Sequence, residues 1–272
     1  MPKISVISGA YNAAVCPHFR ESIESVLGQS FSDFEFIICD DGSTDGTLKL
    51  LLEYEMRDRR VKIIKNEKNL GLAAALNRCL ELSCGEYIAR HDLDDYSAKD
   101  RFKKQINYLE SHREVGILGT AVWLFDDGGV WGKEIMPSKV KKEDFLFNTP
   151  YKHGSVIFRA QELFRAGGYR AANKTLRNED YDLFMRMHTF TVGENLTEPL
   201  YIFCEDEGAF MRRKYKYRLN EARVRLEGFQ KLGLMPRGIP YVIKPLAVGL
   251  IPSPLLKKIR KKALMKRREE KA

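Results

Sequence analysis

The sequence predicts an α/β fold: a mainly parallel sheet flanked by helices, followed by a basic helical C-terminal extension. In the first 130 of 272 residues, short apolar runs alternate with longer segments that have helical spacing. The short runs are apolar throughout, which is typical of strands covered on both faces. Such strands, separated by helices of ten or more residues, favour a parallel sheet between two helix layers. In sheets of this kind, ligands bind beyond the carboxyl ends of the strands.

Each element of this first part has its own signal. The predicted strands are apolar runs, in chain order "ISVIS" at 4–8, "FEFIICD" at 34–40, "VKIIK" at 61–65, "EYIARHD" at 86–92 and "VGILGTAVWLF" at 115–125. The predicted helices lie between and after these strands, at 20–29, 47–59, 72–82 and 100–111. Apolar residues recur at helical spacing in them, and the second helix is expected to turn Leu48, Leu51 and Leu52 inward.

The pattern loosens after residue 130. The segment "VIFRAQELFRAGGY" at 156–169 predicts a strand, a short helix and a Gly-Gly turn. The segment "NEDYDLFMRMHTF" predicts a helix with Asn178 at its N-cap. We therefore expect a catalytic α/β domain at 1–209 and a separate extension at 210–272.

The extension begins with the pattern of a basic helix at 210–232. Residues 239–256 are apolar but contain four prolines and Lys244. A proline inside a helix removes a backbone hydrogen bond, so this segment is a poor candidate for a membrane-spanning helix.

Composition and cysteine usage indicate a globular protein of a reducing compartment. The chain is 44% hydrophobic and 31% charged, so it can bury a substantial core. Its five cysteines are odd in number and form no CxxC pair, and its five histidines lack ligand spacing, which disfavours a zinc site. No apolar leader precedes the first predicted strand, so we expect a cytoplasmic protein.

The net charge of +9 is divided unevenly along the chain. Residues 1–210 hold 27 Lys and Arg against 33 Asp and Glu, a net charge of −6. Residues 211–272 hold 19 against 4, a net charge of +15, and residues 257–268 carry eight basic residues in twelve. A basic end on an acidic body predicts an anionic partner for the extension, either a membrane surface or a nucleic acid.

The loop "DDGSTDGT" at 40–47 follows a predicted strand and precedes a predicted helix. As a simple βα turn it would use Gly42 and Gly46 for unusual backbone angles. The turn alone does not account for two consecutive aspartates at a strand end. One of these carboxylates can face the crevice and accept a hydrogen bond from a base N–H or a sugar hydroxyl. GxxxxGK[ST] and GxGxxG are both absent, which disfavours a P-loop and a dinucleotide fold.

The stretch "HDLDD" at 91–95 has the D-x-D spacing at the end of another predicted strand. On its own, this spacing is more commonly a solvated acidic turn. Beside a second acidic turn it favours a divalent cation, because Mg²⁺ and Mn²⁺ prefer carboxylate oxygens and keep positions open for a bound diphosphate. A metal held in this way stabilises a diphosphate leaving group.

Taken together and in order, several blocks resemble the family 2 glycosyltransferases of the GT-A fold. They are "PKISVIS", "YNA", "SVLGQSFSDFEFIICDDGSTDGT", "NLGLAAALNRCLELSCGEYIARHDLDD", "HGSVIFR" and "GGY" followed by "NEDYDL", covering roughly residues 2–205. The resemblance implies inverting transfer of a sugar from a nucleoside diphosphate sugar, a UDP-sugar being favoured, with Mn²⁺ or Mg²⁺ on the diphosphate. Gly9 and Ala10 depart from the Pro-Thr that often precedes Tyr-Asn in the family, which leaves the preferred base open.

The resemblance also implies roles for residues on the donor side. Tyr11 and Asp41 match positions that line the nucleoside site, and Asn69 and Gly71 shape a turn near the nucleotide. The D-x-D consists of Asp92 and Asp94, with Asp94 as the usual metal contact. Asp95 extends this acidic end toward the donor sugar or diphosphate.

On the acceptor side, Asp180 matches the catalytic base of the family. His153 lies where the family often has a histidine, and Trp131 and Glu179 are further candidates near the acceptor. Packing is the simpler explanation for Trp131. Arg101, in the first turn of the helix predicted at 100–111, is interpreted as an ordinary surface charge.

Helical geometry separates the aspartates of "NEDYDLFMRM". Asp180 shares a face with the apolar residues three, four and seven positions later, so it is expected to point inward. Asp182 lies roughly 200° around the helix, facing Arg186 at i+4, and is expected to form a solvated ion pair.

We therefore predict a metal-dependent inverting transferase of hexosyl or N-acetylhexosaminyl groups, acting on a glycan or lipid-linked acceptor in surface polysaccharide synthesis. We expect it at the inner face of the plasma membrane, held as a peripheral protein by its basic tail. A sugar nucleotidylyltransferase is an alternative, but "SGAYNAAVCP" lacks the Gly-rich, basic loop such enzymes use. A nucleic-acid-binding module would leave the acidic crevice unexplained, so no nucleic acid is expected as partner.

Overall fold

The computed structural model describes residues 1–126, 128–204, 215–251 and 255. Its strands are β1 (Ile4–Ala10), β2 (Phe34–Asp40), β3 (Val61–Lys65), β4 (Tyr87–Arg90), β5 (Tyr96–Ser97), β6 (Val115–Asp126), β7 (Gly129–Glu134), β8 (Ile157–Arg159) and β9 (Val192–Cys204). Its helices are α1 (Phe19–Leu27), α2 (Thr47–Arg57), α3 (Leu72–Leu82), α4 (Arg101–Ser111), α5 (Ala160–Arg165), α6 (Glu179–Met187), α8 (Tyr215–Lys231) and α9 (Ile239–Gly249), with short 3₁₀ turns η1 (Lys142–Leu146) and η2 (His153–Ser155).

Within the described residues, these strands form one sheet in the order β3-β2-β1-β4-β8-β6-β9-β5, with β7 paired to β6. The strands β3, β2, β1 and β4 are parallel, as predicted. β8 then runs antiparallel to both β4 and β6, and β6 is parallel to β9. The predicted α/β class is confirmed, and the parallel order belongs mainly to the N-terminal half.

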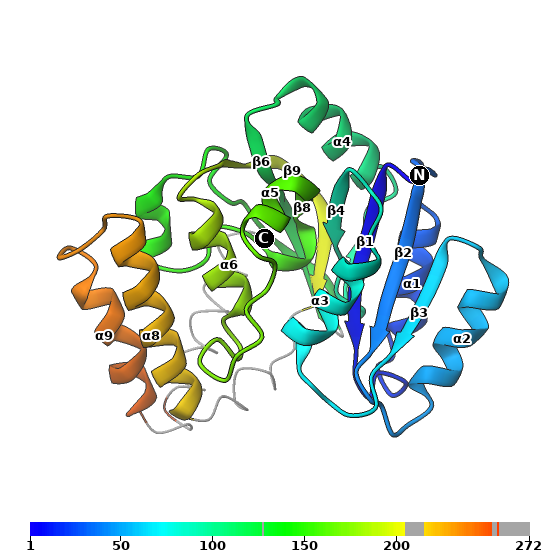
Figure 1. The fold of residues 1–272 in the computed structure, drawn as a ribbon, viewed down its shortest axis with the longest axis horizontal. Helices are drawn as coiled ribbons and strands as arrows, with labels where there is room; N and C mark the ends of the chain where they lie inside the picture. Colours follow the sequence, from blue (N-terminus) through cyan, green and yellow to red (C-terminus); the bar gives the residue numbers. More distant parts are fainter. Residues whose placement is uncertain (127, 205–214, 252–254, 256–272) are drawn as a thin grey trace.

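Two apolar clusters cover the two faces of the sheet, which is why its strands are apolar throughout. In β1, Ile4 and Val6 belong to one cluster, and Ile7 belongs to the other. Helices α1, α2 and α4 pack on the first face, whereas α3, α6 and α8 pack on the second. In Figure 1, α3 lies in front of the strands and α1 lies behind them. Each fully buried aliphatic or aromatic side chain contributes about 1.5–3 kcal/mol to this packing.

The helix boundaries agree closely with the sequence pattern, with two corrections. The expectation that Leu52 turns inward is wrong, because it is 41% exposed and Tyr54 is buried in its place. The buried face of α2 runs through Thr47, Leu51 and Tyr54, at i, i+4 and i+7. Asn178 does stand at the N-cap position of α6, but its side chain makes no capping hydrogen bond.

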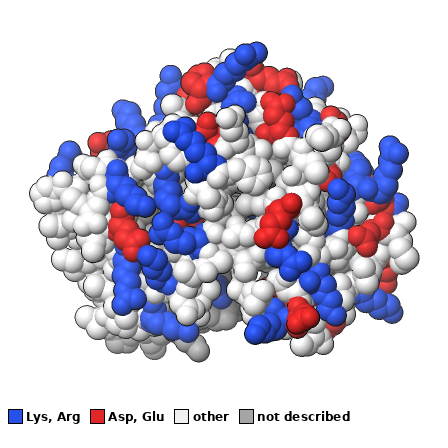
Figure 2. Space-filling view, in the orientation of Figure 1, with Lys and Arg blue, Asp and Glu red and all other residues white. Residues whose placement is uncertain are grey.

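The extension contributes α8 and α9, and α8 confirms the helical part of the prediction for 210–232 from residue 215 onward. The predicted boundary between 209 and 210 lies among residues 205–214, outside the described residues. Phe229 of α8 belongs to the same apolar cluster as α3 and α6. No helix of the described residues is both long and apolar enough to cross a bilayer. Figure 2 shows Lys and Arg gathered over α6 and α8, whereas the outer edge at α9 carries few charges.

Candidate active site

The carboxyl ends of β1 and β2 bring the first two predicted motifs together. The backbone N–H of Asn12 donates to Ser43 Oγ at 2.9 Å, and that of Thr44 donates to Asn12 Oδ1 at 2.9 Å. These bonds tie the segment that begins at Tyr11 to the "DDGSTDGT" loop. Tyr11 itself is 49% exposed, so its ring is accessible to a ligand.

Asp41 is buried and organises the turn that precedes α3. One carboxylate oxygen accepts from Asn66 Nδ2 at 2.8 Å and from the backbone N–H of Leu70 at 2.9 Å. The other accepts from the backbone N–H of Gly71 at 2.7 Å, where φ is +92°. The structure therefore places Asp41 against the turn at Leu70 and Gly71, which also contains Asn69. A nucleoside contact by Asp41 remains a prediction.

Gly42 makes this arrangement possible. Its φ is +73°, and a Cβ at this position would lie 2.6 Å from the carbonyl carbon of Lys68. A side chain would therefore force the "DDGSTDGT" loop away from the turn that carries Asn69.

The D-x-D lies directly after β4, and its three aspartates have different environments. Asp92 forms an ion pair with the buried Arg90, and its backbone N–H donates to Tyr201 Oη at 3.0 Å. Asp94 is exposed. Asp95 is buried and accepts a hydrogen bond from the backbone N–H of Cys204 at 2.7 Å. Burial, and then the charges of Asp94 and Asp92, hold the pKa of Asp95 well above its usual value.

Two fully buried arginines make hydrogen bonds and an ion pair with the residues around the D-x-D. Arg90 donates to the carbonyl oxygen of His91 and pairs with Asp92. Arg101 donates to the carbonyl oxygen of Arg90 at 2.8 Å and to Ser97 Oγ at 2.9 Å, and its guanidinium lies 4.9 Å from the ring centre of Tyr201. The interpretation of Arg101 as a surface charge is wrong, because its side chain is wholly buried. Burial lowers the pKa of Arg101 to about 10, so it remains a cation at neutral pH.

The start of α6 carries a second acidic group. Burial, and then the charge of Asp180, raise the pKa of Glu179 to about 7. Asp180 is half-buried in the first turn. The expectation that Asp182 forms a solvated ion pair is wrong in one respect: the pair with Arg186 exists at 2.8 Å, but Asp182 is only 5% exposed.

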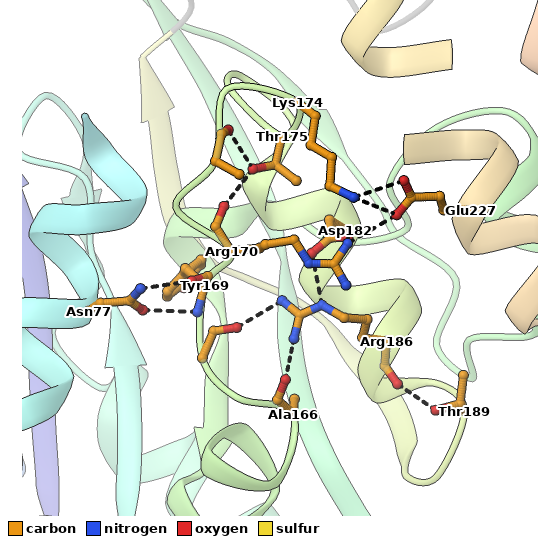
Figure 3. Close-up of polar contacts among 12 residues, drawn as sticks. Asn77, Ala166, Tyr169, Arg170, Lys174, Thr175, Asp182, Arg186, Thr189 and Glu227 are labelled. Atoms are coloured by element: carbon orange, nitrogen blue, oxygen red, sulfur yellow. Dashed lines mark hydrogen bonds and ion pairs between the residues drawn. The ribbon is translucent and has the colours of Figure 1, made fainter. Parts of the chain in front are cut away.

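Asp182 is buried because a second arginine covers it. Arg170 Nη1 lies 3.0 Å from Asp182 Oδ1 and 3.1 Å from Glu227 of α8 (Figure 3). Arg186 also donates to the carbonyl oxygens of Ala166 and Gly168. The network thus joins the Gly-Gly turn, α6 and α8, and it fixes the segment that leads into Glu179 and Asp180.

Tyr169 is a buried aromatic residue directly after the Gly-Gly turn. Its hydroxyl lies 2.8 Å from His153 Nε2. Burial is the main cause that raises the pKa of Tyr169, Arg90 opposes the rise, and the charges of Asp180, Asp92 and Glu179 add to it.

The remaining acceptor-side candidates occupy different surroundings. Burial lowers the pKa of His153 well below its usual value, so its imidazole is neutral near pH 7. Trp131, in β7, is half-buried and packs on a small cluster that includes Val122, Leu124 and Tyr201. This agrees with the packing interpretation, and a contact between Trp131 and an acceptor remains a prediction.

The donor atoms present fit a metal that is shared with a ligand. No group of three His, Cys, Asp or Glu side chains among the described residues is arranged to hold a metal ion. Asp94 and the partly exposed Asp92 nevertheless offer carboxylate oxygens just beyond the carboxyl end of β4. One or two carboxylates, completed by diphosphate oxygens and water, are a common arrangement for Mg²⁺.

Comparison with known proteins identifies the family. The family described as glycosyl transferase family 2 matches residues 5–181. The putative glycosyltransferase EpsE of Bacillus subtilis is 40% identical over 270 residues, which is 98% of this chain and 96% of that protein. The chain belongs to glycosyl transferase family 2.

Solved structures confirm the GT-A fold of this glycosyltransferase. S. aureus TarS 1–349 superposes with a TM-score of 0.68 at 20% identity, over 89% of this chain and 72% of TarS. The same TarS fragment has been solved with UDP-GlcNAc. The mannosyltransferase PcManGT of Pyrobaculum calidifontis, solved with GDP-Man and Mn²⁺, superposes with a TM-score of 0.63 at 18% identity, over 99% of this chain and 82% of that one.

Four residues of the glycosyltransferase site escaped the sequence analysis: Arg90, Tyr169, Arg170 and Tyr201. Arg90 could have been found from the sequence, because an arginine two positions before an aspartate at a strand end is placed to form an ion pair with it. Tyr201 could not have been found in this way, since its contact with Asp92 joins residues that are 109 positions apart in sequence.

Proposed function

We propose that this glycosyltransferase moves a sugar from a nucleoside diphosphate sugar to a hydroxyl of a glycan or lipid-linked acceptor, with inversion at the anomeric carbon. One observation supports this most strongly: Asp92 and Asp94 keep carboxylate oxygens accessible directly after β4, in a chain that belongs to glycosyl transferase family 2. A donor diphosphate bound at the D-x-D and an acceptor hydroxyl bound at the start of α6 would lie on opposite sides of the transferred sugar.

Asp180 is proposed as the base. The acceptor oxygen attacks the anomeric carbon, the bond from that carbon to the diphosphate oxygen breaks, and the hydroxyl proton passes to the Asp180 carboxylate. The helix N-terminus favours the ionised carboxylate before transfer, which keeps it ready to accept the proton. Asp182 cannot take this role because Arg170 and Arg186 occupy its oxygens.

The donor end is proposed to hold the diphosphate through a divalent cation at Asp94 and Asp92, Mn²⁺ or Mg²⁺. Such an ion supplies charge stabilisation to the leaving diphosphate. Arg90 and Tyr201 orient Asp92, and the turn at Asn69 and Gly71 lies beside the proposed nucleoside site. A UDP-sugar is favoured, and the TarS complex with UDP-GlcNAc supports that choice. PcManGT, solved with GDP-Man and Mn²⁺, supports the metal and makes GDP the first competitor to test.

Thermal shift with UDP-, GDP- and dTDP-sugars, each with Mn²⁺, Mg²⁺ or EDTA, tests this function. We expect a UDP-sugar to raise the melting temperature only when a divalent ion is present, and the Asp94→Ala variant to lose that metal-dependent shift. Equal stabilisation by UDP-sugar in EDTA would contradict the metal role. Absence of a shift with every nucleoside diphosphate sugar would contradict the proposed function.

A further inference from the structure

Helix α9 presents an apolar stripe to solvent. Ile239, Ile243 and Leu250 are 44%, 53% and 75% exposed, and Leu246 is half-buried between them. These positions are spaced i, i+4, i+7 and i+11, so they lie within about 60° of one another around the helix. The opposite side of α9 packs on the protein, where Pro245 is buried.

A further exposed aromatic ring lies beside this helix. Phe147, just after η1, is 63% exposed, and its ring centre lies 4.9 Å from that of Tyr241 in α9. Lys244 Nζ lies 6.0 Å from the ring centre of Phe147. The apolar face therefore has a cation at its border, the arrangement that suits the boundary between headgroups and acyl chains.

The charge around α9 is positive. Lys216, Arg223, Lys231, Arg237 and Lys244 are exposed on the described part of the extension. Its two carboxylates in that part are both paired, Glu221 with Arg218 and Arg225, and Glu227 with Lys174 and Arg170. In sequence, eight basic residues lie at 257–268, after the helix and the seven residues that follow it.

We propose that α9 is an interfacial helix that lies on an anionic lipid bilayer, with Ile239, Ile243, Leu246 and Leu250 facing the acyl chains. Its eleven residues span about 16 Å, too short to cross a hydrocarbon core of about 30 Å, so the helix lies in the plane of the surface. The basic residues of the extension attract the anionic headgroups, and the apolar stripe supplies the insertion.

The charge distribution favours a bilayer over a second copy of this chain as the occupant. Two copies meeting through α9 would bring two strongly basic extensions, each with a net charge of +15, against one another. An anionic leaflet instead neutralises that charge. Membrane contact would place the protein at the inner face of the plasma membrane and near a lipid-linked acceptor.

Vesicle flotation of the full-length protein tests the stripe and the charge separately. The wild type is expected to float with phosphatidylcholine vesicles only when they contain phosphatidylglycerol, and less at high salt. Ile243→Glu should reduce the bound fraction by about tenfold or more, because a carboxylate would enter the apolar boundary and meet anionic headgroups. Met56→Glu is the matched control: Met56 is 81% exposed on α2, and the same change there should leave flotation unchanged.

Two further measurements keep the test decisive if Ile243→Glu fails to fold. A variant ending at Leu255 keeps α9 and removes the basic tail, and it should bind phosphatidylglycerol vesicles more weakly than the full-length protein but still measurably. An Ile243→Trp variant should show quenching of the added emission by brominated lipids in anionic vesicles. Flotation that is independent of phosphatidylglycerol, equal binding of Ile243→Glu, or absence of quenching would each overturn the proposal. Concentration-dependent dimers that Ile243→Glu dissociates would assign the face to a second copy instead.

Discussion

The acidic group after β4 and the acidic group at the start of α6 each contain three carboxylates, yet the fold treats them differently. After β4, Asp94 is exposed and Asp92 is partly exposed, while Asp95 is buried. At the start of α6, Glu179 has a pKa raised to about 7, and Asp182 is enclosed by two arginines. One group keeps carboxylate oxygens at the surface, and the other surrounds Asp180 with a protonatable neighbour and a neutralised one.

This difference matches two chemical tasks. Carboxylates at a solvated sheet edge suit a hydrated divalent cation and a diphosphate. A half-buried carboxylate at a helix N-terminus, beside a group that is close to half protonated near pH 7, suits proton transfer. The comparison makes the two groups separable by mutation.

Asp180→Asn should have a large effect on transfer. It preserves the shape of the side chain but removes the proton acceptor, so we expect transfer to fall by about 10²-fold or more while donor affinity stays near normal. Steady-state transfer and donor titration measure the two quantities. Asp33→Asn, at an exposed position before β2, is the matched control. A transfer rate near the wild-type value would move the base to Glu179.

Asp94→Ala should remove the metal-dependent part of donor binding. Losing several kcal/mol of charge stabilisation at the diphosphate corresponds to a fall in turnover on the order of 10²-fold or more. Folding should be unaffected because Asp94 is exposed. The measurement is UDP-sugar affinity and turnover against Mn²⁺ concentration, with Asp33→Ala as control. If EDTA leaves turnover of the wild type unchanged, no divalent metal acts at Asp92 and Asp94.

The contrast between the two groups was only partly predictable from sequence. The D-x-D, the "DDGSTDGT" loop and the first four parallel strands follow from local patterns, because strand ends and βα turns are set by residues close in the chain. The burial of Arg101 and Asp182 is set by partners that are distant in sequence. Arg101 meets Tyr201 of β9, and Asp182 meets Arg170. A helical wheel places Asp182 on an outer face but says nothing of what covers that face.

Asp182→Asn tests the second group for stability rather than catalysis. Breaking a buried ion pair leaves its partner charge uncompensated, which costs about 3–5 kcal/mol when both partners are fully buried. Arg170 keeps 30% side-chain exposure, so we expect a smaller loss, about 2 kcal/mol in the free energy of unfolding. Urea denaturation measures it. Glu198→Gln, which breaks the exposed pair with Lys104, should change stability by well under 1 kcal/mol. Equal effects of the two substitutions would show that the ion pairs of Arg170 and Arg186 with Asp182 add nothing to the free energy of unfolding.

Glu179→Gln gives the most specific test, because its effect on stability depends on pH. The pKa of Glu179 is about 7 in the folded protein against 4.5 for the ordinary group, so the folded state binds the proton more tightly than the unfolded state. Its contribution to stability is therefore fully present below pH 4.5 and is lost as the pH rises through 7. The wild type should lose stability relative to Glu179→Gln across this window, on the order of 3 kcal/mol in total.

Urea denaturation of the two proteins at several pH values between 4.5 and 8 measures this difference. Glu67→Gln, at an exposed position before α3, is the control and should give a curve parallel to the wild type. If the wild-type and Glu179→Gln curves are also parallel, Glu179 titrates in the folded protein as it does in the unfolded chain. Asp180 would then lack a protonatable neighbour, and the two acidic groups would differ only in the arginines that cover Asp182.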